Sequence, residues 1–358
     1  MRQLMLGNQA FARGLYEAGC CVASSYPGTP STEVTEEAAK YDEIYCEWAP
    51  NEKVAMEVAF GASLAGKRSF CGMKHVGLNV AADPLYTCSY TGVNAGMVIC
   101  VADDAGMHSS QNEQDSRHHA IAAKVPMLEP SDSAEAYHFV KRAFELSEEF
   151  DTPFIVKMCT RVSHSQSIVD TGERVMPEPK KYEKNIAKYV MMPGNAIRRH
   201  PIVEERTRKL IAFAEHCEFN RVEMGDTSIG IITSSTCYQY VKEVFGDKAS
   251  VLKLGMINPL PEKLILDFAS KVDKLVIVEE LDPIIENHCR QLGLEVSGKD
   301  LFPLEGEISQ NMVAQKLGVA LNETKKLDEA LPARPPVMCA GCPHRGLFYT
   351  LSKNKCTV

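Results

Sequence analysis

The chain has 358 residues, 45% of them hydrophobic and 24% charged, which is enough apolar material for two or three folded domains and excludes wholesale disorder. A net charge of −8 argues against nucleic acid as a main partner, because nucleic-acid binding needs a clustered basic surface. Thirteen cysteines are too few for a disulfide scaffold, and no apolar run reaches the ~18 residues of a membrane-spanning helix, so we expect a cytoplasmic protein with no membrane partner.

The first predicted element is a helix close to the N-terminus. Five apolar side chains share one face at helical spacing: Leu4, Ala10, Phe11, Leu15 and Ala18. Gly19 is expected to end this helix. The same segment lacks the apolar region of a signal peptide, which agrees with a cytoplasmic location.

The first 165 residues alternate short apolar runs with segments of helical length. The runs predict strands at 21–24, 44–47, 69–73, 97–102 and 154–158. Helices are predicted at 31–41, 53–65, 83–91, 117–123 and 134–150. Strands that alternate with helices favour a parallel sheet covered on both faces, so residues 1–165 are predicted to form a doubly wound α/β domain with 97–102 as a buried central strand.

A second α/β pattern follows a proline-bearing, lysine-rich stretch at 166–205, which is the predicted linker. Strands are predicted at 229–233, 251–254 and 274–279. Helices are predicted at 206–219, 236–245, 262–270 and 284–292. Residues 206–321 are therefore expected to form a second, smaller doubly wound domain, and 322–358 a further linker that opens a new motif.

Two segments of the first domain follow predicted strands and carry residues suited to ligand binding. Residues 25–33, SYPGTPSTE, combine a rigid turn with capping hydroxyls, so they form either a well-capped turn or part of a ligand site. After the strand at 69–73 come Lys74 and His75, which could hold an anion or polarise a carbonyl, or lie in a solvated loop.

Three further features have both a structural and a functional interpretation. Glu52 follows the capping residue Asn51, so it is either an ordinary first-turn glutamate or a buried acid. Residues 102–119 are too polar for a short connection and form either a surface excursion or a functional loop. Cys339 and Cys342 form a CxxC pair that is half of a metal or redox site, and a structural zinc would need two more ligands.

Five segments in this order resemble one family: YPGTPSTE (26–33), EWAPNEKVAMEVAFGAS (47–63), MKHVGLNVAADPL (73–85), DDAGMHSSQNEQDSR (103–117) and CAGCPHR (339–345). Over nearly the whole chain they resemble the thiamine diphosphate-dependent 2-oxoacid:ferredoxin oxidoreductases, in particular the alpha subunit of the indolepyruvate type. Ala340 stands where this family usually has proline. The resemblance implies that residues 1–165 bind the thiamine pyrimidine and that residues 206–321 are similar to the carboxyl-terminal domain of transketolase. It also implies that residues 322–358 contain a linker and the start of the diphosphate-binding domain.

The resemblance also implies roles for individual residues. It assigns cofactor contacts to Tyr26, Gly28, Glu52 and His75, and substrate contacts to Thr29, His108 and Arg117. In such enzymes a glutamate in an apolar cleft hydrogen-bonds the pyrimidine of thiamine diphosphate, so that the cofactor's imino group can remove the thiazolium proton. By this resemblance Glu52 is the catalytic glutamate, and Thr29 binds the carboxylate of the 2-oxoacid.

The implied reaction is oxidative decarboxylation of an aryl 2-oxoacid to an acyl-coenzyme A, with electrons passed to ferredoxin. The implied partners are a beta subunit and ferredoxin, in a homodimer or heterotetramer. Mg²⁺ and iron–sulfur clusters are expected on a remainder beyond residue 358, so this chain by itself is expected to be inactive and to bind thiamine diphosphate poorly. Two alternatives stay open, namely a transketolase-like or non-oxidative thiamine enzyme and a non-catalytic assembly scaffold.

Overall fold

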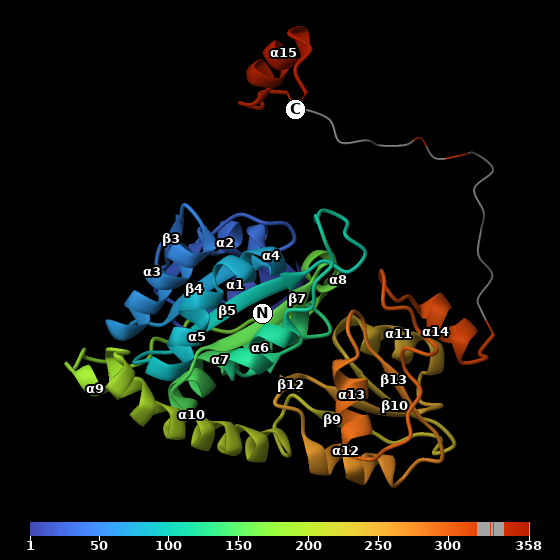
Figure 1. Ribbon diagram of the computed structural model, residues 1–358. Helices are drawn as coiled ribbons and strands as arrows, with labels where there is room; N and C mark the ends of the chain where they lie inside the picture. The colour runs from blue at the N-terminus through green and yellow to red at the C-terminus, as the bar shows by residue number, and fades with distance from the viewer. Residues whose placement is uncertain (321–329, 331, 333–339, 358) are drawn as a thin grey trace. The chain divides into compact units, whose positions relative to one another are not determined.

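The computed structural model describes residues 1–320, 330, 332 and 340–357, which fall into two compact units, Met1–Ala320 and Leu321–Val358. The first unit contains both predicted sheets (Figure 1). In the second, the described helix is α15 (Arg345–Lys353). Within the described ranges no helix combines the length and apolar character needed to cross a membrane.

The larger sheet has seven strands in the order β12-β6-β7-β5-β4-β2-β3. They are β2 (Val22–Ser25), β3 (Tyr45–Trp48), β4 (Ser69–Lys74), β5 (Met97–Asp103), β6 (Met127–Leu128), β7 (Phe154–Cys159) and β12 (Met256–Asn258). Six of them run parallel, and β12 pairs antiparallel with β6. All residues of β5 are buried, which confirms the predicted central strand.

Helices cover both faces of this sheet (Figure 1). They are α1 (Gly7–Glu17), α2 (Thr32–Ala38), α3 (Glu52–Leu64), α4 (His75–Val80), α5 (Ala82–Thr91), α6 (Arg117–Ala123), α7 (Ser133–Phe150) and α8 (Thr160–His164). Phe11 of α1 and Phe144 of α7 pack in one core with Val98 of β5, whereas Met56 of α3 and Ile99 of β5 belong to the core of the opposite face. Successive β5 side chains enter different cores, as the alternation along a strand requires.

The smaller sheet has the order β13-β10-β11-β9, with β9 antiparallel to β11. Its strands are β9 (Arg221–Glu223), β10 (Gly230–Ser234), β11 (Ser250–Leu254) and β13 (Leu275–Val278). Its helices are α11 (Ser235–Phe245), α12 (Glu262–Ala269), α13 (Ile284–Gln291) and α14 (Gln310–Lys316). The predicted fold class of two doubly wound α/β sheets is thus confirmed, and each sheet carries one antiparallel edge strand.

The two sheets of Met1–Ala320 are joined to each other. β12 follows β11 directly in the chain but pairs with β6 of the larger sheet. Ile232 of β10 and Leu252 of β11 lie in the same apolar core as Ile155 of β7. We call the larger sheet with its helices the first α/β layer and the smaller sheet with its helices the second α/β layer. The second layer is therefore attached to the first through backbone pairing and a common core.

The predicted N-terminal helix starts later than expected. Arg2–Leu6 forms β1, which pairs antiparallel with β8 (Gln166–Asp170), and Leu4 is 63% exposed. The helix begins at Gly7, while Gly19, at φ +74°, lies just beyond its end as predicted. The placement of Leu4 in a helix was wrong because a strand partner 160 residues away in the sequence decides the conformation of this segment.

The segment 166–205, the predicted linker, contains β8, α9 (Ile186–Tyr189) and the start of α10 (Pro193–Ala214). Pro193 stands in the first turn, where a missing N–H costs nothing. Two buried arginines fix α10 to α5: Arg199 donates to Tyr90 O at 2.7 Å, and Arg206 donates to Ser89 O at 2.7 Å. These contacts explain why the helix predicted to begin at residue 206 starts at Pro193.

Candidate active site

The candidate site lies where neighbouring strands β2 and β4 end. β2 leads through α2 to the edge strand β3, whereas β4 leads through α4 and α5 to β5 on its other side. Connections that leave in opposite directions open a crevice at the carboxyl ends of the strands, where open α/β sheets bind ligands. Tyr26 to Thr29 follow β2, and Lys74 to Gly77 span the end of β4 and the start of α4 (Figure 1).

The turn after β2 is closed by its own polar groups and lies against Lys74. The backbone N–H of Gly28 donates to Thr32 Oγ1 at 2.8 Å. A Cβ on Gly28 would lie 3.0 Å from Cβ of Lys74, so the absence of a side chain allows this approach. The side chains of Tyr26 and Thr29 remain exposed at the edge of the crevice.

Glu52 is the first residue of α3 and is half-buried. Asn51 caps the helix by accepting the N–H of Val54 at 3.0 Å. The side chain of Glu52 packs on Gly77 of α4 so closely that a Cβ on Gly77 would lie 2.5 Å from Glu52 Oε1. Among the described residues, the Glu52 carboxyl group has no hydrogen-bond or ion-pair partner, so its oxygens are available to a ligand.

The surroundings of Glu52 include a buried thiol. Burial raises the pKa of Cys71 on β4 well above its ordinary value. Cys71 is therefore an uncharged, weakly polar neighbour. Glu52 thus has a neutral thiol and no counter-ion among its described neighbours.

His75 lies at the start of α4 and is 1% exposed. Its Nε2 is 3.2 Å from the carbonyl oxygen of Asn112, so Nε2 carries a proton and donates it. In the neutral ring Nδ1 is then an acceptor, and this buried atom has no partner in the part of the chain described. An orphaned acceptor at the crevice is a group that a bound ligand could satisfy.

The polar loop after β5 covers this region from the other side. Asp104 accepts hydrogen bonds from Ser109 N at 2.9 Å, Ser110 Oγ at 2.5 Å and Thr160 Oγ1 at 2.7 Å. Burial favours the neutral acid, but these hydrogen bonds prevail and the pKa of Asp104 is lowered. Lys74 Nζ donates to Ser109 O. The loop is thus fixed to β4 and α8, although residues 106–109 and 111–112 are exposed, so it is a surface segment with defined contacts.

His108, predicted to contact substrate, stands on the outer part of this loop. Its side chain is 47% exposed, and its Nε2 lies 3.0 Å from Glu307 Oε2. Arg161 of α8 donates to both oxygens of the same carboxylate, at 2.7 and 2.6 Å. His108 therefore faces the second α/β layer.

Arg117, also predicted to contact substrate, is buried at 2% exposure and engaged elsewhere. It forms a two-pronged pair with Asp115, with Nε and Nη2 donating to the carboxylate at 2.9 and 2.6 Å. Nη1 donates to Glu279 Oε2 at 2.7 Å, and Nη2 also reaches the carbonyl oxygens of Glu280 and Asp282. This placement favours a structural role for Arg117, which joins α6 to the end of β13, over the predicted substrate contact.

Arg117 belongs to a network of buried charges between the two layers. Its ionisable members are Arg117, Lys157, Asp103, Asp115, Glu129 and Glu279. Burial raises the pKa of Asp115, but the Arg117 guanidinium outweighs burial and lowers this pKa to about 2. Burial dominates at Asp103 and Glu279, whose pKa values are raised. Two cations thus cannot fully compensate four carboxyl groups, and the network shares its protons unequally.

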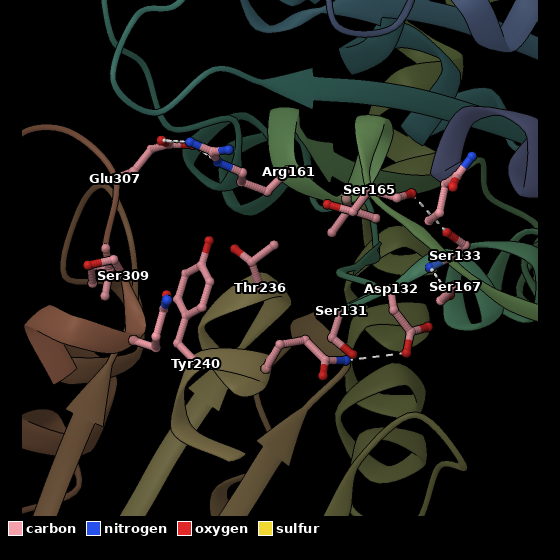
Figure 2. A pocket seen from close by; sticks show the side chains of 15 residues that line it. Ser131, Asp132, Ser133, Arg161, Ser165, Ser167, Thr236, Tyr240, Glu307 and Ser309 are labelled. Atoms are coloured by element: carbon pink, nitrogen blue, oxygen red, sulfur yellow. Dashed lines mark hydrogen bonds and ion pairs between the residues drawn. The ribbon is translucent and has the colours of Figure 1, made fainter. Parts of the chain in front are cut away.

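A cavity of about 630 Å³ separates the two layers beyond Arg161. Figure 2 shows Ser131, Ser133 and Ser165 of the first layer facing Thr236 and Tyr240 of the second. The lining is rich in hydroxyl groups. The only cation that lines it within the described chain is Arg161, whose charge is matched by Glu307. The cavity therefore offers hydroxyl groups but no free positive charge among the described residues that line it.

The CxxC pair gives no metal centre in the residues that the structure covers. Cys339 lies outside the described residues. Cys342 is half-buried in the turn before α15, and its carbonyl oxygen accepts the N–H of Arg345 at 3.1 Å. Across the described ranges there is no group of three or more His, Cys, Asp or Glu side chains placed to hold a metal. The predicted metal role of Cys339 and Cys342 stays a prediction.

Sequence reasoning missed Arg161 and Glu307, and it assigned no role to Gly77. Gly77 lies inside a motif, where its position two residues after His75 could have suggested a close approach to α3. Glu307 lies outside every motif, and its 199-residue separation from His108 leaves no local signal. Arg161 became visible only when α8, which was not predicted, placed it beside Glu307.

Residues 13–225, more than half of the chain, match the family described as "Pyruvate flavodoxin/ferredoxin oxidoreductase, thiamine diP-bdg". The chain belongs to this family. The match covers the crevice residues Gly28, Glu52 and His75, and also the loop that carries His108. It runs through α10 to β9 and so includes every strand of the larger sheet except β12.

Curated relatives show which members of the family the chain resembles. The chain is 42% identical to "Indolepyruvate oxidoreductase subunit IorA" of Archaeoglobus fulgidus and 40% identical to the protein of the same name in Pyrococcus horikoshii, each over 98% of this chain. It spans about 60% of the length of these relatives. "2-oxoglutarate synthase subunit KorA" of Archaeoglobus fulgidus is 24% identical over 86% of this chain and 99% of its own. The resemblance predicted from the five motifs is confirmed.

Solved structures agree on the fold. A "2-oxoglutarate:ferredoxin oxidoreductase from Magnetococcus marinus with 2-oxoglutarate, coenzyme A and succinyl-CoA bound" superposes with a TM-score of 0.75 at 18% identity, over 88% of this chain and 65% of the other. A "Split gene transketolase, inactive beta4 tetramer" superposes with a TM-score of 0.54 at 15% identity, over 88% of this chain and 97% of the other. At these identities the likeness supports the fold.

Proposed function

We propose that this chain is a subunit of a thiamine diphosphate-dependent 2-oxoacid oxidoreductase and that its crevice at β2 and β4 binds the pyrimidine half of the cofactor. The single observation that carries the proposal is Glu52, whose half-buried carboxyl group lies unpaired on Gly77. The family match over 13–225 supports the choice of cofactor. The orphaned Nδ1 of His75 fits a polar ligand in the same crevice.

When bound, thiamine diphosphate supplies a nucleophilic thiazolium carbon that attacks a keto carbon and makes loss of carbon dioxide possible. In the proposal Glu52 holds a proton on its carboxyl group and donates a hydrogen bond to the pyrimidine. Gly77 keeps the space beside Glu52 free of a side chain, and the buried Cys71 helps exclude water. His75 accepts a hydrogen bond at Nδ1 while Asn112 fixes its ring.

The substrate is proposed to be an aryl 2-oxoacid. The names of relatives at 40–42% identity support this choice, while the relative named 2-oxoglutarate synthase, at 24%, supplies the competing substrate. Thr29 is proposed to donate its exposed hydroxyl to the substrate carboxylate, and His108 to stand near the reacting carbon. In this proposal Arg117 is a buried structural residue, and the substrate contacts are left to Thr29 and His108.

The remaining parts of the reaction would come from outside the described residues. Coenzyme A as acyl acceptor, ferredoxin as electron acceptor, a beta subunit, and Mg²⁺ and iron–sulfur clusters in an assembled enzyme are proposed from the family. A homodimer or heterotetramer and a cytoplasmic location stay predictions. A transketolase-like or non-oxidative enzyme and a non-catalytic scaffold are the alternatives that the experiment must exclude.

The test is steady-state turnover of the assembled enzyme with indolepyruvate and with 2-oxoglutarate, followed by coenzyme A-dependent reduction of ferredoxin. We expect indolepyruvate to be the better substrate and Glu52→Gln to lower turnover by roughly 10²-fold or more, since the acid's proton is lost. Glu57→Gln, an exposed glutamate on the same helix, is the matched control and should keep full activity. Unchanged turnover in Glu52→Gln would favour the non-catalytic scaffold. Decarboxylation without reduction of ferredoxin would favour the non-oxidative enzyme.

A further inference from the structure

The loop 104–116 has two sides with different partners. On its inner side Lys74 donates to Ser109 O, and His75 donates to Asn112 O at 3.2 Å. These two contacts connect the loop directly to the last residue of β4 and the first residue of α4, close to Gly77 and Glu52. Any displacement of the loop therefore changes what holds His75 in place.

On its outer side the same loop is held by the segment 306–308 of the second layer. Glu113 accepts the N–H of Gly106 at 2.6 Å and the N–H of Gly306 at 3.2 Å, so one carboxylate joins the loop to that segment. Next in sequence, Glu307 lies 3.0 Å from His108 Nε2. The loop and the second layer thus meet through two carboxylates that point in opposite directions across the contact.

Glu307 is itself well fixed. Both of its oxygens accept hydrogen bonds from Arg161 of α8, and the neighbouring N–H of Ile308 donates to Glu280 Oε1 at 2.9 Å. Burial favours the neutral acid, but the hydrogen bonds from Arg161 and His108 prevail and lower the pKa of Glu307. A two-pronged pair with arginine is geometrically specific, so Glu307 presents a charged oxygen to His108 in one orientation.

We propose that Glu307 is a positioning residue, through which the second α/β layer holds His108 and the loop 104–116 over the crevice. The proposal rests on the proposed function for the role of the crevice, but the contact itself does not. In this proposal Glu307 contacts neither cofactor nor substrate. It acts on the reaction by fixing His108 directly and His75 through the loop.

The first test is hydrogen–deuterium exchange of the full chain without substrate. Glu307→Ala should speed exchange in residues 104–116 by roughly fivefold or more, because loss of tertiary contacts lowers the free energy of local opening. Glu305→Ala is the matched control, since Glu305 is exposed two residues away and makes no hydrogen bond or ion pair to another described residue. Equal exchange of the loop in both variants would overturn the proposal.

The second test is kinetic and uses the assembled enzyme. Glu307→Ala should raise KM for the 2-oxoacid by roughly tenfold while kcat falls less, because a mispositioned group weakens substrate orientation. Glu307→Gln should recover part of the loss, since its amide oxygen can still accept from His108. Arg161→Met should give a smaller effect than Glu307→Ala. A larger effect of Arg161→Met than of Glu307→Ala would overturn the proposal, because Arg161 would then act by a route other than Glu307.

The two arms separate failure of this proposal from failure of the proposed function. If the wild-type enzyme shows no thiamine-dependent turnover, the proposed function fails, while the exchange experiment still decides whether Glu307 orders the loop. If turnover is present and Glu307→Ala changes neither loop exchange nor KM, the positioning role fails alone.

Discussion

Two charged regions of Met1–Ala320 lie at the ends of neighbouring strands and differ in how their charges are satisfied. Around Arg117, each charged group is buried and has partners within the chain, and the result is a joint between two layers. Around Glu52, a half-buried carboxyl group and the buried His75 Nδ1 have no partner among the described residues. The contrast teaches that a polar group satisfied inside the fold serves stability, whereas one left unsatisfied at a crevice is available for chemistry.

The largest effect on stability is expected at the joint around Arg117. Arg117→Ala leaves Asp115 and Glu279 buried without their cation, so we expect a loss of about 3–5 kcal/mol in the free energy of unfolding. Urea denaturation measures it. Arg208→Ala is the control, because its pair with Glu205 is exposed, and it should change stability by less than about 0.5 kcal/mol. Similar small changes in both variants would contradict the assignment of Arg117 as a structural residue.

A smaller effect on stability is expected from Glu280, at the edge of the joint. Burial raises the pKa of Glu280 to about 7 in the fold, and the charge of Glu307 adds to this rise. The N–H of Ile308 and the charges of Lys157 and Lys299 lower this pKa but do not outweigh burial. An acid with a raised pKa destabilises the fold as it ionises, so its contribution worsens as the pH rises from about 4.5 to about 7.

Glu280→Gln removes this ionisation. The variant should gain roughly 2–3 kcal/mol relative to wild type between pH 5 and pH 8, as measured by chemical denaturation at both values. The comparison between the two proteins cancels the titration of all other groups. A stability difference that stays constant over this range would show that Glu280 does not carry a raised pKa.

The next prediction concerns the site rather than the joint. Gly77→Ala places a Cβ 2.5 Å from Glu52 Oε1, and the flexible carboxyl end must move away. Stability should change by less than about 1 kcal/mol, because alanine suits a helix better than glycine. The KM for thiamine diphosphate in the assembled enzyme should nevertheless rise roughly tenfold, since the acid loses its position. Wild-type kinetics in this variant would break the contrast between the two regions.

The smallest effect is expected at Gly61 on α3, where the substitution Gly61→Ala is the control for Gly77→Ala. Apart from the chain neighbours and the backbone of its own helix, no described atom lies within 4 Å of a Cβ built there, so Gly61→Ala meets no obstacle. The variant should be more stable by about 0.5–1 kcal/mol, because glycine in a helix interior carries an entropic cost, and its activity should equal that of wild type. Thermal unfolding and the same kinetic assay check both expectations.

Local pattern was sufficient to predict the parts of the molecule that local chemistry determines. The apolar run at 97–102 predicted β5, and the turn, cap and glycine signals placed Gly28, Glu52 and His75 after their strands. The five motifs also predicted the family. These features depend on alternation, capping and turn residues that lie within a few positions of one another.

Other features depend on partners far away in the chain and could not be predicted locally. Arg2–Leu6 became a strand because Gln166–Asp170 pairs with it. The pair of His108 with Glu307 joins elements of different layers. Arg117 was predicted to bind substrate, yet its two-pronged contact with Asp115 and its reach to Glu279 depend on how the second layer docks. The sequence pattern contains the residues of such contacts but not the geometry.

The most direct test of the site is a structure of the assembled enzyme determined with thiamine diphosphate. We predict that the Glu52 carboxyl group lies within hydrogen-bond distance of a pyrimidine nitrogen, with Gly77 behind it and the loop 104–116 closing the crevice. A cofactor bound elsewhere, with Glu52 turned into bulk water, would contradict the proposed function.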